Sequence, residues 1–290
     1  MVNYDNKRWL KLLFTFKGSV IKEITPKVII FTLNAMIITF FYHKMNNIKI
    51  STAPFTIIGG ALGFLLVFRT NTSYDRYWEG RKLWGELTNQ TRNLAIKIEN
   101  YCINNKDKAK EIMNLHNAFL NLVKMTIRDE KDYGSVEKFM NKDLFEKIKK
   151  HKRPHIVIAA IISYKIMELK KSKIIDEIEH MLISQNMDTI MNATGGIERI
   201  RRTPIPIAYA LHLKRVLYIF SFLLPLAFVD TIGWWTVPVV TFISYVFLGI
   251  EEIGVEIEDP FGEDANDLPI DDICINLEGN IEDIENILKN

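Results

Sequence analysis

Two pairs of apolar runs constrain the fold of this chain more than any other feature of its sequence. They lie at 28–42 and 53–68 near the N-terminus and at 216–229 and 234–250 near the C-terminus, and none contains a charged residue. Each is shorter than the roughly 20 residues of a spanning helix, and Pro225 and Pro238 interrupt two of them. Buried helices of a soluble core are therefore an alternative, but two such hairpins favour four transmembrane helices.

The distribution of basic residues predicts the orientation of these helices, because cytosolic flanks are rich in Lys and Arg. The connection between the last two runs contains no Lys or Arg. By contrast, the first 27 residues contain several basic residues, namely Lys7, Arg8, Lys11, Lys17, Lys22 and Lys27. We therefore expect a multi-pass protein of the cell inner membrane with both termini and the middle of the chain in the cytosol.

The residues between the two hairpins read as helical and polar. Leu83, Leu87, Leu94 and Ile98 recur at near-helical spacing, and neither strand alternation nor a repeat is visible. We expect a break near 128–136 and further punctuation at Pro154 and at the Gly195-Gly196 pair. The predicted segments are a cytosolic amphipathic arm (1–27), a first transmembrane hairpin (28–68), a helical cytosolic domain (69–204), a second hairpin (205–250) and an acidic cytosolic tail (251–290).

No catalytic constellation is visible, so we do not expect an enzyme. The sequence contains no Gly-rich phosphate loop, no HExxH and no GxSxG. Pro154 separates His151 from His155, which favours solvated surface histidines over a metal pair. The net charge of +2 gives no sign of a nucleic-acid partner.

The second apolar run carries two helical patterns. Gly59 and Gly63 form a GxxxG pair, which is typical of close helix packing, while Gly60, Phe64 and Phe68 recur every four residues on a neighbouring face. The phenylalanines either face lipid or, if copies of this helix surround an axis, form an apolar constriction that gates by dewetting.

The last 40 residues are strongly acidic, and Lys289 is their only basic residue. Most acidic tails are simply solvated. Here, however, residues 256–269 gather carboxylates around a Pro-Phe-Gly turn, and such hard oxygen ligands suit Ca²⁺. The ligand spacing is not that of an EF-hand, so this composition leaves a calcium site and a solvated loop both open.

Four stretches together resemble the bestrophin family in its bacterial branch. They are FKGS (16–19), RTNTSYDRYWEGRKLWG (69–85), IPIAYALHLKR (205–215) and DPFGED (259–264). The resemblance implies an all-α integral membrane protein, with four transmembrane helices and a large helical cytosolic domain, that assembles as a pentameric homo-oligomer in membrane lipid. It also implies an ion channel, passing chloride in animal relatives and sodium in some bacterial ones.

The resemblance further implies which residues line the ion path. The family's hydrophobic neck falls on Gly60, Phe64 and Phe68, and its cytosolic aperture falls on Ile178. The family's calcium clasp falls on the carbonyls of Glu256 and Asp259 and the side chains of Asp264 and Asp267, with an N-terminal carbonyl whose position the sequence leaves open. Ala265 and Asn266 interrupt the acidic run that animal members have there, so calcium is not a required cofactor on this reading.

We therefore expect a channel for small monovalent ions rather than an enzyme. The alternative is a membrane-tethered signalling or scaffolding protein, in which the hairpins only anchor a helical cytosolic domain. The two readings differ in whether Phe64 faces a water path or lipid.

Overall fold

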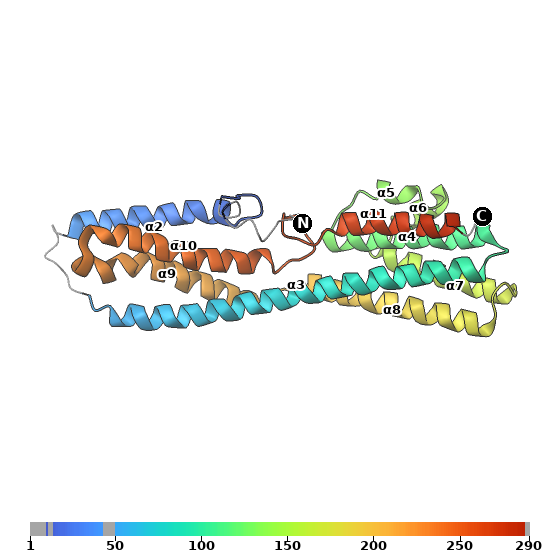
Figure 1. The fold of residues 1–290 in the computed structure, drawn as a ribbon, viewed down its shortest axis with the longest axis horizontal. Coiled ribbons are helices and arrows are strands. Elements are labelled where there is room, and N and C mark those ends of the chain that lie inside the picture. Colours follow the sequence, from blue (N-terminus) through green and yellow to red (C-terminus); the bar gives the residue numbers. More distant parts are fainter. Residues whose placement is uncertain (1–9, 11–13, 43–49, 288–290) are drawn as a thin grey trace. The chain divides into compact units, whose positions relative to one another are not determined.

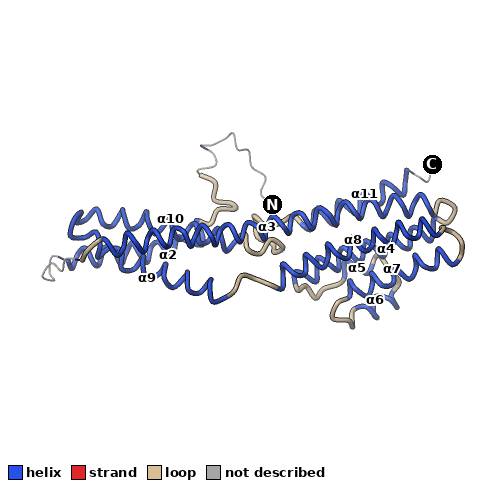
Figure 2. The backbone as a smooth tube through the Cα atoms, turned by 90° about the horizontal axis from the view of Figure 1, so that it is seen from below, coloured by secondary structure: helices blue, strands red, loops and turns tan. Residues whose placement is uncertain are grey.

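The structure is a computed structural model that describes residues 10, 14–42 and 50–287, and within these ranges it contains helices and loops but no strand (Figure 2). The long helices are α2 (Ile21–Tyr42), α3 (Ala53–Tyr101), α4 (Lys106–Arg128), α7 (Pro154–Lys171), α8 (Glu177–Arg202), α9 (Ile207–Ile232), α10 (Thr236–Glu256) and α11 (Ile270–Ile287). The short ones are α5 (Gly134–Glu137), α6 (Lys142–Ile148) and the 3-10 turn η1 (Gly233–Trp235). Much of the predicted N-terminal arm, the connection at 43–49 and Lys289 lie outside the described residues.

The described helices form two compact units. The first unit contains residues up to Trp78 together with Thr203–Asp267, and the second contains Glu79–Arg202 together with the residues from Leu268 onward. Within the first unit, α2, α9, α10 and the first part of α3 lie side by side (Figure 1). Their shared core consists of Ala35, Leu62, Leu66, Leu213, Phe220, Leu224 and Val240, which come from all four helices.

The helices of the first unit are longer than the apolar runs in the sequence. With 22 residues in α2, 26 in α9 and 21 in α10, each exceeds the roughly 30 Å of a bilayer core at about 1.5 Å per residue. Pro225 lies inside α9 without ending it, and Pro238 falls in the first turn of α10, where proline removes no helical hydrogen bond. The expectation that these prolines interrupt the apolar segments is therefore wrong.

Large apolar side chains are exposed along the outer faces of this unit. Ile30, Phe40, Phe222 and Phe242 are each more than half exposed. Three helical stretches of the described chain are long and apolar enough to cross a membrane: α2, α3, and the span Ile207–Glu256 that comprises α9, η1 and α10. Helices that are apolar on their outer as well as their inner faces are typical of a lipid environment.

The second unit is a helical bundle of conventional amphipathic helices. The buried face of α4 includes Ile112, Leu115, Phe119, Leu122 and Val123, the apolar stripe expected of such a helix. α4 packs against α7, α8 and α11. The predicted break near 128–136 is confirmed, since α4 ends at Arg128 and Asp129 takes a left-handed conformation with φ of 56°. Pro154 is likewise the first residue of α7.

Two local predictions for this unit are wrong. Gly195 and Gly196 do not interrupt the chain but lie inside α8. A Cβ on Gly196 would lie 2.9 Å from both terminal methyl carbons of Leu83, so this glycine permits a close approach of α8 to α3. His155 is not a surface residue: its ring is 1% exposed, with Nδ1 3.1 Å from Thr126 Oγ1 and Nε2 3.1 Å from Glu198.

The acidic tail is also more structured than a solvated tail. Ile270, Cys274, Leu277 and Ile281 of α11 are buried, and α11 packs on α4. Its acidic residues pair with basic residues of the same unit, for example Asp271 with Lys124 at 2.9 Å and with Arg128 at 2.7 Å. Residues 270–287 therefore form an amphipathic helix whose apolar face is buried and whose acidic residues pair with basic residues of the same unit. The tail is divided between the two units: the end of α10 and the loop that follows it belong to the first unit, and α11 belongs to the second.

Candidate pore-lining helix and acidic loop

The first part of α3 has two contrasting faces. Leu62 and Leu66 are 1% exposed and pack against α9, α10 and α2 in the core of the first unit. Phe64 and Phe68 are 70% and 64% exposed, and Gly60, on the same stripe, has nothing within 4 Å of where a Cβ would lie. The three residues expected to form a neck thus share an open face of α3, and none of them contributes to the core of the subunit.

The two glycines of the GxxxG pair have different surroundings. A Cβ on Gly59 would lie 3.3 Å from the Phe220 ring of α9, so this glycine does let two helices approach closely. Gly63 has nothing within 4 Å of its own Cβ position. Close packing inside the subunit therefore involves only the first glycine of the pair.

A buried ion pair anchors α3 just beyond Phe68. The side chain of Arg69 is 3% exposed, and its guanidinium donates a 2.6 Å hydrogen bond to the Glu258 carboxylate. The other oxygen of Glu258 accepts from the Ile205 backbone N–H at 3.0 Å, and its backbone carbonyl accepts from the Arg76 guanidinium at 3.2 Å. Glu258 therefore ties the loop after α10 to two turns of α3 and to the chain before α9.

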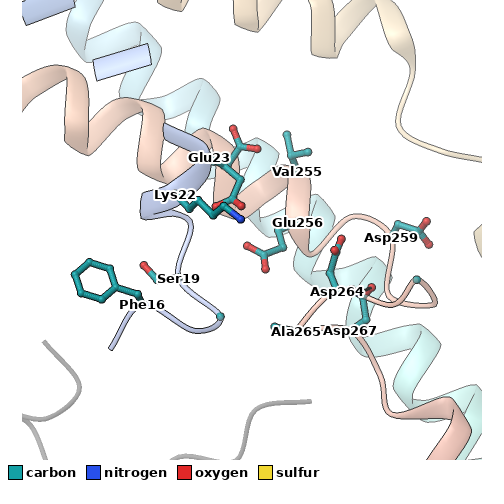
Figure 3. A pocket seen from close by; sticks show the side chains of 13 residues that line it. Phe16, Ser19, Lys22, Glu23, Val255, Glu256, Asp259, Asp264, Ala265 and Asp267 are labelled. Carbon is teal, nitrogen blue, oxygen red and sulfur yellow. Dashed lines mark hydrogen bonds between the residues drawn. The ribbon is translucent and has the colours of Figure 1, made fainter. Parts of the chain in front are cut away.

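The acidic loop forms one wall of a pocket at this end of the first unit. Glu256, Asp259, Asp264 and Asp267, the four residues of the expected clasp, all line it. Figure 3 shows Phe16 and Ser19 of the N-terminal segment on the opposite side of the pocket from Asp264 and Asp267, with the Phe16 ring directed away from these acids. The structure thus brings together two segments more than 200 positions apart in sequence, as the Gly18–Asn266 contact shows.

Asn266 connects three parts of this unit. Its side-chain nitrogen donates to the Gly18 carbonyl oxygen at 3.0 Å and to Glu256 Oε1 at 2.7 Å. Its backbone carbonyl accepts from the Tyr77 hydroxyl of α3 at 3.3 Å. Gly18 has a φ of 76°, a left-handed conformation that glycine adopts without strain and that the FKGS sequence provides.

Hydrogen bonds already engage several polar groups around this pocket. The group that joins Gly18 to Glu256 is the side-chain nitrogen of Asn266, which donates both bonds. One oxygen of Asp267 accepts from the Asp264 backbone N–H at 2.8 Å, and burial raises the pKa of Asp267 to about 6, helped by the nearby carboxylate of Asp264. Among the described residues, no three His, Cys, Asp or Glu side chains converge as a metal site.

Ile178, the residue expected at the aperture, lies in the second unit. It is the second residue of α8 and is 63% exposed, and Met181, one turn further on, is 49% exposed.

Sequence reasoning missed several residues that organise this site. Arg69 and Glu258 were not singled out, and Asn266 was named only as an interruption of the acidic run, although each makes contacts between segments distant in sequence. Arg69 and Arg76 lie in the stretch at 69–85, which entered the sequence analysis only through the family resemblance. Nothing in the sequence indicated which acid would pair with Arg69.

Comparison with known proteins decides the family. The sequence profile of the family described as Bacterial/Fungal Bestrophin protein matches residues 1–283. The chain belongs to the bestrophin family. The structure superposes on that of a bacterial bestrophin homologue from Klebsiella pneumoniae with a TM-score of 0.86 at 30% identity, covering 91% of this chain and 98% of the other.

Relatives of this bestrophin include proteins with a named activity. It is 36% identical over 288 residues to the voltage-dependent anion channel-forming protein alr2987 of Nostoc sp., covering 98% of this chain and 94% of the relative. It is 30% identical over 280 residues to the voltage-dependent anion channel-forming protein YneE of Escherichia coli, covering 96% and 92%. The predicted family and the all-α integral membrane fold are confirmed.

Proposed function

We propose that this bestrophin is one subunit of an ion channel that passes small monovalent ions along an axis surrounded by copies of α3. The observation that carries the proposal is the exposure of Phe64 and Phe68 on the face of α3 opposite the buried Leu62 and Leu66. In a ring of subunits, these side chains form a neck of stacked aromatic rings that opens and closes by wetting. Gly60 leaves one end of the neck wide.

The assembly we propose is a homo-pentamer in the cell inner membrane, crossed four times by each subunit, with both termini in the cytosol. Exposed apolar faces on α2, α9 and α10 supply the lipid and subunit contacts that such an assembly needs. The basic residues that precede α2 and the absence of Lys and Arg between the last two apolar runs support the orientation. Ile178 of each subunit forms a second, cytosolic constriction.

The permeant ion follows from the chemistry of the neck. The edges of aromatic rings carry partial positive charge and therefore favour anions such as chloride, in line with the names of the Nostoc and Escherichia coli relatives. A ring of phenylalanines carries no formal charge that excludes sodium. The sign of the reversal potential under a salt gradient separates the two ions.

The acidic loop, on this proposal, needs no calcium to hold its shape. The Asn266 amide makes the connection between the N-terminal segment and Glu256. The Asp264 backbone N–H already occupies one oxygen of Asp267. Chelation of divalent cations is therefore expected to leave the current unchanged.

The experiment that tests the channel is a bilayer recording of the purified protein under a sodium chloride gradient. Phe64→Ala, which removes bulk from the neck, is expected to raise the conductance or the open probability. Phe242→Ala, at an equally exposed site on α10, is the control and should leave the current unchanged. A folded oligomer without current in wild type and variant would support a membrane-tethered scaffold instead.

A further inference from the structure

A shallow apolar groove lies between α2 and α9 in the first unit. It has a volume of about 380 Å³ and is lined by Lys27, Ile30, Phe31, Tyr218, Ile219, Phe222 and Leu223. Ile30 and Ile219, on its opposite walls, are 58% and 60% exposed. The groove is thus open along its length, and its walls are almost entirely carbon.

The two helices run parallel with a constant register. The Asn34 side chain donates to the Phe222 carbonyl at 2.7 Å, and the Tyr42 hydroxyl donates to Asp230 at 2.9 Å, and each bond joins residues 188 positions apart. The same offset places Arg215 of α9 at the level of Lys27 of α2. Helical periodicity puts Arg215 on the face of Ile219 and Phe222, which is the face that lines the groove.

Three cations lie near this end of the groove, and they differ in their partners. Lys27 forms an ion pair with Glu252 of α10, and Lys214 lies 3.5 Å from Glu251. Arg215 is exposed, and within the described part of the chain no ion pair or hydrogen bond involves its guanidinium. An arginine with all five donors available matches a phosphate, because the guanidinium can hold two of its oxygens at once.

We propose that this groove binds an anionic glycerophospholipid, with its phosphate on Arg215 and one acyl chain along Ile219, Phe222 and Leu223. The inference rests on the proposed orientation, in which the N-terminal ends of α2 and α9 lie at the cytosolic leaflet. Leu223 lies eight residues beyond Arg215, which is about 12 Å along the helix and within the hydrocarbon depth of one leaflet. Negative lipid headgroups of the cytosolic leaflet meet Arg215 at that level.

The test is lipid retention by the full-length oligomer, measured by native mass spectrometry in the presence of phosphatidylglycerol or phosphatidylcholine. Wild type is expected to retain phosphatidylglycerol selectively, and Arg215→Gln to weaken that retention at least about tenfold. The control is Arg81→Gln, which removes an exposed arginine of α3 that does not line the groove and should retain phosphatidylglycerol as wild type does. Equal retention of the two lipids by wild type, or full retention by Arg215→Gln, would overturn the proposal.

A second measurement separates lipid from a neighbouring copy of this chain. Both cysteines of the described chain are buried, so a spin label attached through Ile219→Cys reports on the groove alone. Contact with lipid-soluble oxygen supports a lipid occupant, whereas an immobile label shielded from oxygen shows that another subunit covers the groove and overturns the proposal. Currents recorded from the same preparation keep this outcome distinct from a failure of the proposed channel function.

Discussion

The side-chain nitrogen of Asn266 lies 3.0 Å from the Gly18 carbonyl oxygen and so fastens the loop after α10 to the segment before α2. The same nitrogen binds Glu256, at the end of α10. A single amide group therefore connects a backbone carbonyl before α2 with a carboxylate at the end of α10.

Asn266→Ala is expected to release the N-terminal segment. The substitution leaves the Gly18 carbonyl and one oxygen of Glu256 without their donor, at a cost of about 1–3 kcal/mol. Limited trypsin digestion of the purified oligomer should therefore cut faster at Lys17 or Lys22. Asn276→Ala, at an exposed position of α11, is the control. Equal rates of cleavage in wild type and Asn266→Ala would show that the segment is held by other contacts.

Breaking the Arg69–Glu258 pair is expected to be far more damaging than breaking a surface pair. Glu258→Gln leaves a guanidinium with a 3% exposed side chain without its counter-charge, which costs about 3–5 kcal/mol. Glu79→Gln breaks the exposed pair with Arg199, whose side chains are 45% and 65% exposed, and costs at most about 1 kcal/mol. Both losses of stability can be measured by heating the detergent-solubilised protein and monitoring the remaining oligomer by size-exclusion chromatography. Similar losses from the two variants would contradict the structural role assigned to Glu258.

Adjacent glycines in α8 are expected to respond oppositely to alanine. Gly195 has open space at its Cβ position, so Gly195→Ala gains helix propensity, about 1 kcal/mol. Gly196→Ala places a methyl 2.9 Å from Leu83 and forces that side chain to move, at about 1–3 kcal/mol. The melting temperature should rise for the first variant and fall for the second. Recovery in Gly196→Ala/Leu83→Ala would assign the loss to this contact.

Stability is expected to fall as pH drops from 7 to 5, in part because of His116. Burial lowers the pKa of this histidine to about 3, and its Nε2 lies 3.0 Å from Thr91 Oγ1. The unfolded chain takes up a proton near the ordinary pKa of about 6.5 while the folded chain stays neutral. The contribution of His116 to the free energy of unfolding is therefore fully present above the unfolded-state pKa and declines as the pH falls below it. Between pH 7 and 5 the loss is about 2 kcal/mol.

His116→Gln tests this origin, because glutamine retains a polar group near Thr91 but does not titrate. The difference between the melting temperatures at pH 7 and pH 5 should be smaller in His116→Gln than in wild type. His151→Gln, at an exposed position, is the control and should leave the difference unchanged. An unaltered difference in His116→Gln would place the pH dependence on other groups.

The sequence by itself determined the helical class, the apolar segments and the stripe of Gly60, Phe64 and Phe68 on one helix face. Uncharged runs and a four-residue spacing are local properties, so Phe64 and Phe68 could be placed on one face of a helix without any knowledge of its neighbours. The four residues of the expected clasp, by contrast, were assigned through the resemblance to the bestrophin family. Local patterns could not reveal that proline would be tolerated inside α9, since the surrounding helices decide that.

Only the tertiary structure decided which distant residues meet. Arg69 could have paired with any of many acids, and the fold selects Glu258. The parallel register of α2 and α9, which brings Arg215 level with Lys27, depends on contacts between residues 188 positions apart. Burial of His155 likewise follows from the packing of α7 near Thr126 and Glu198. Such contacts are set by how whole helices pack, and the local sequence of each helix does not encode its partner's register.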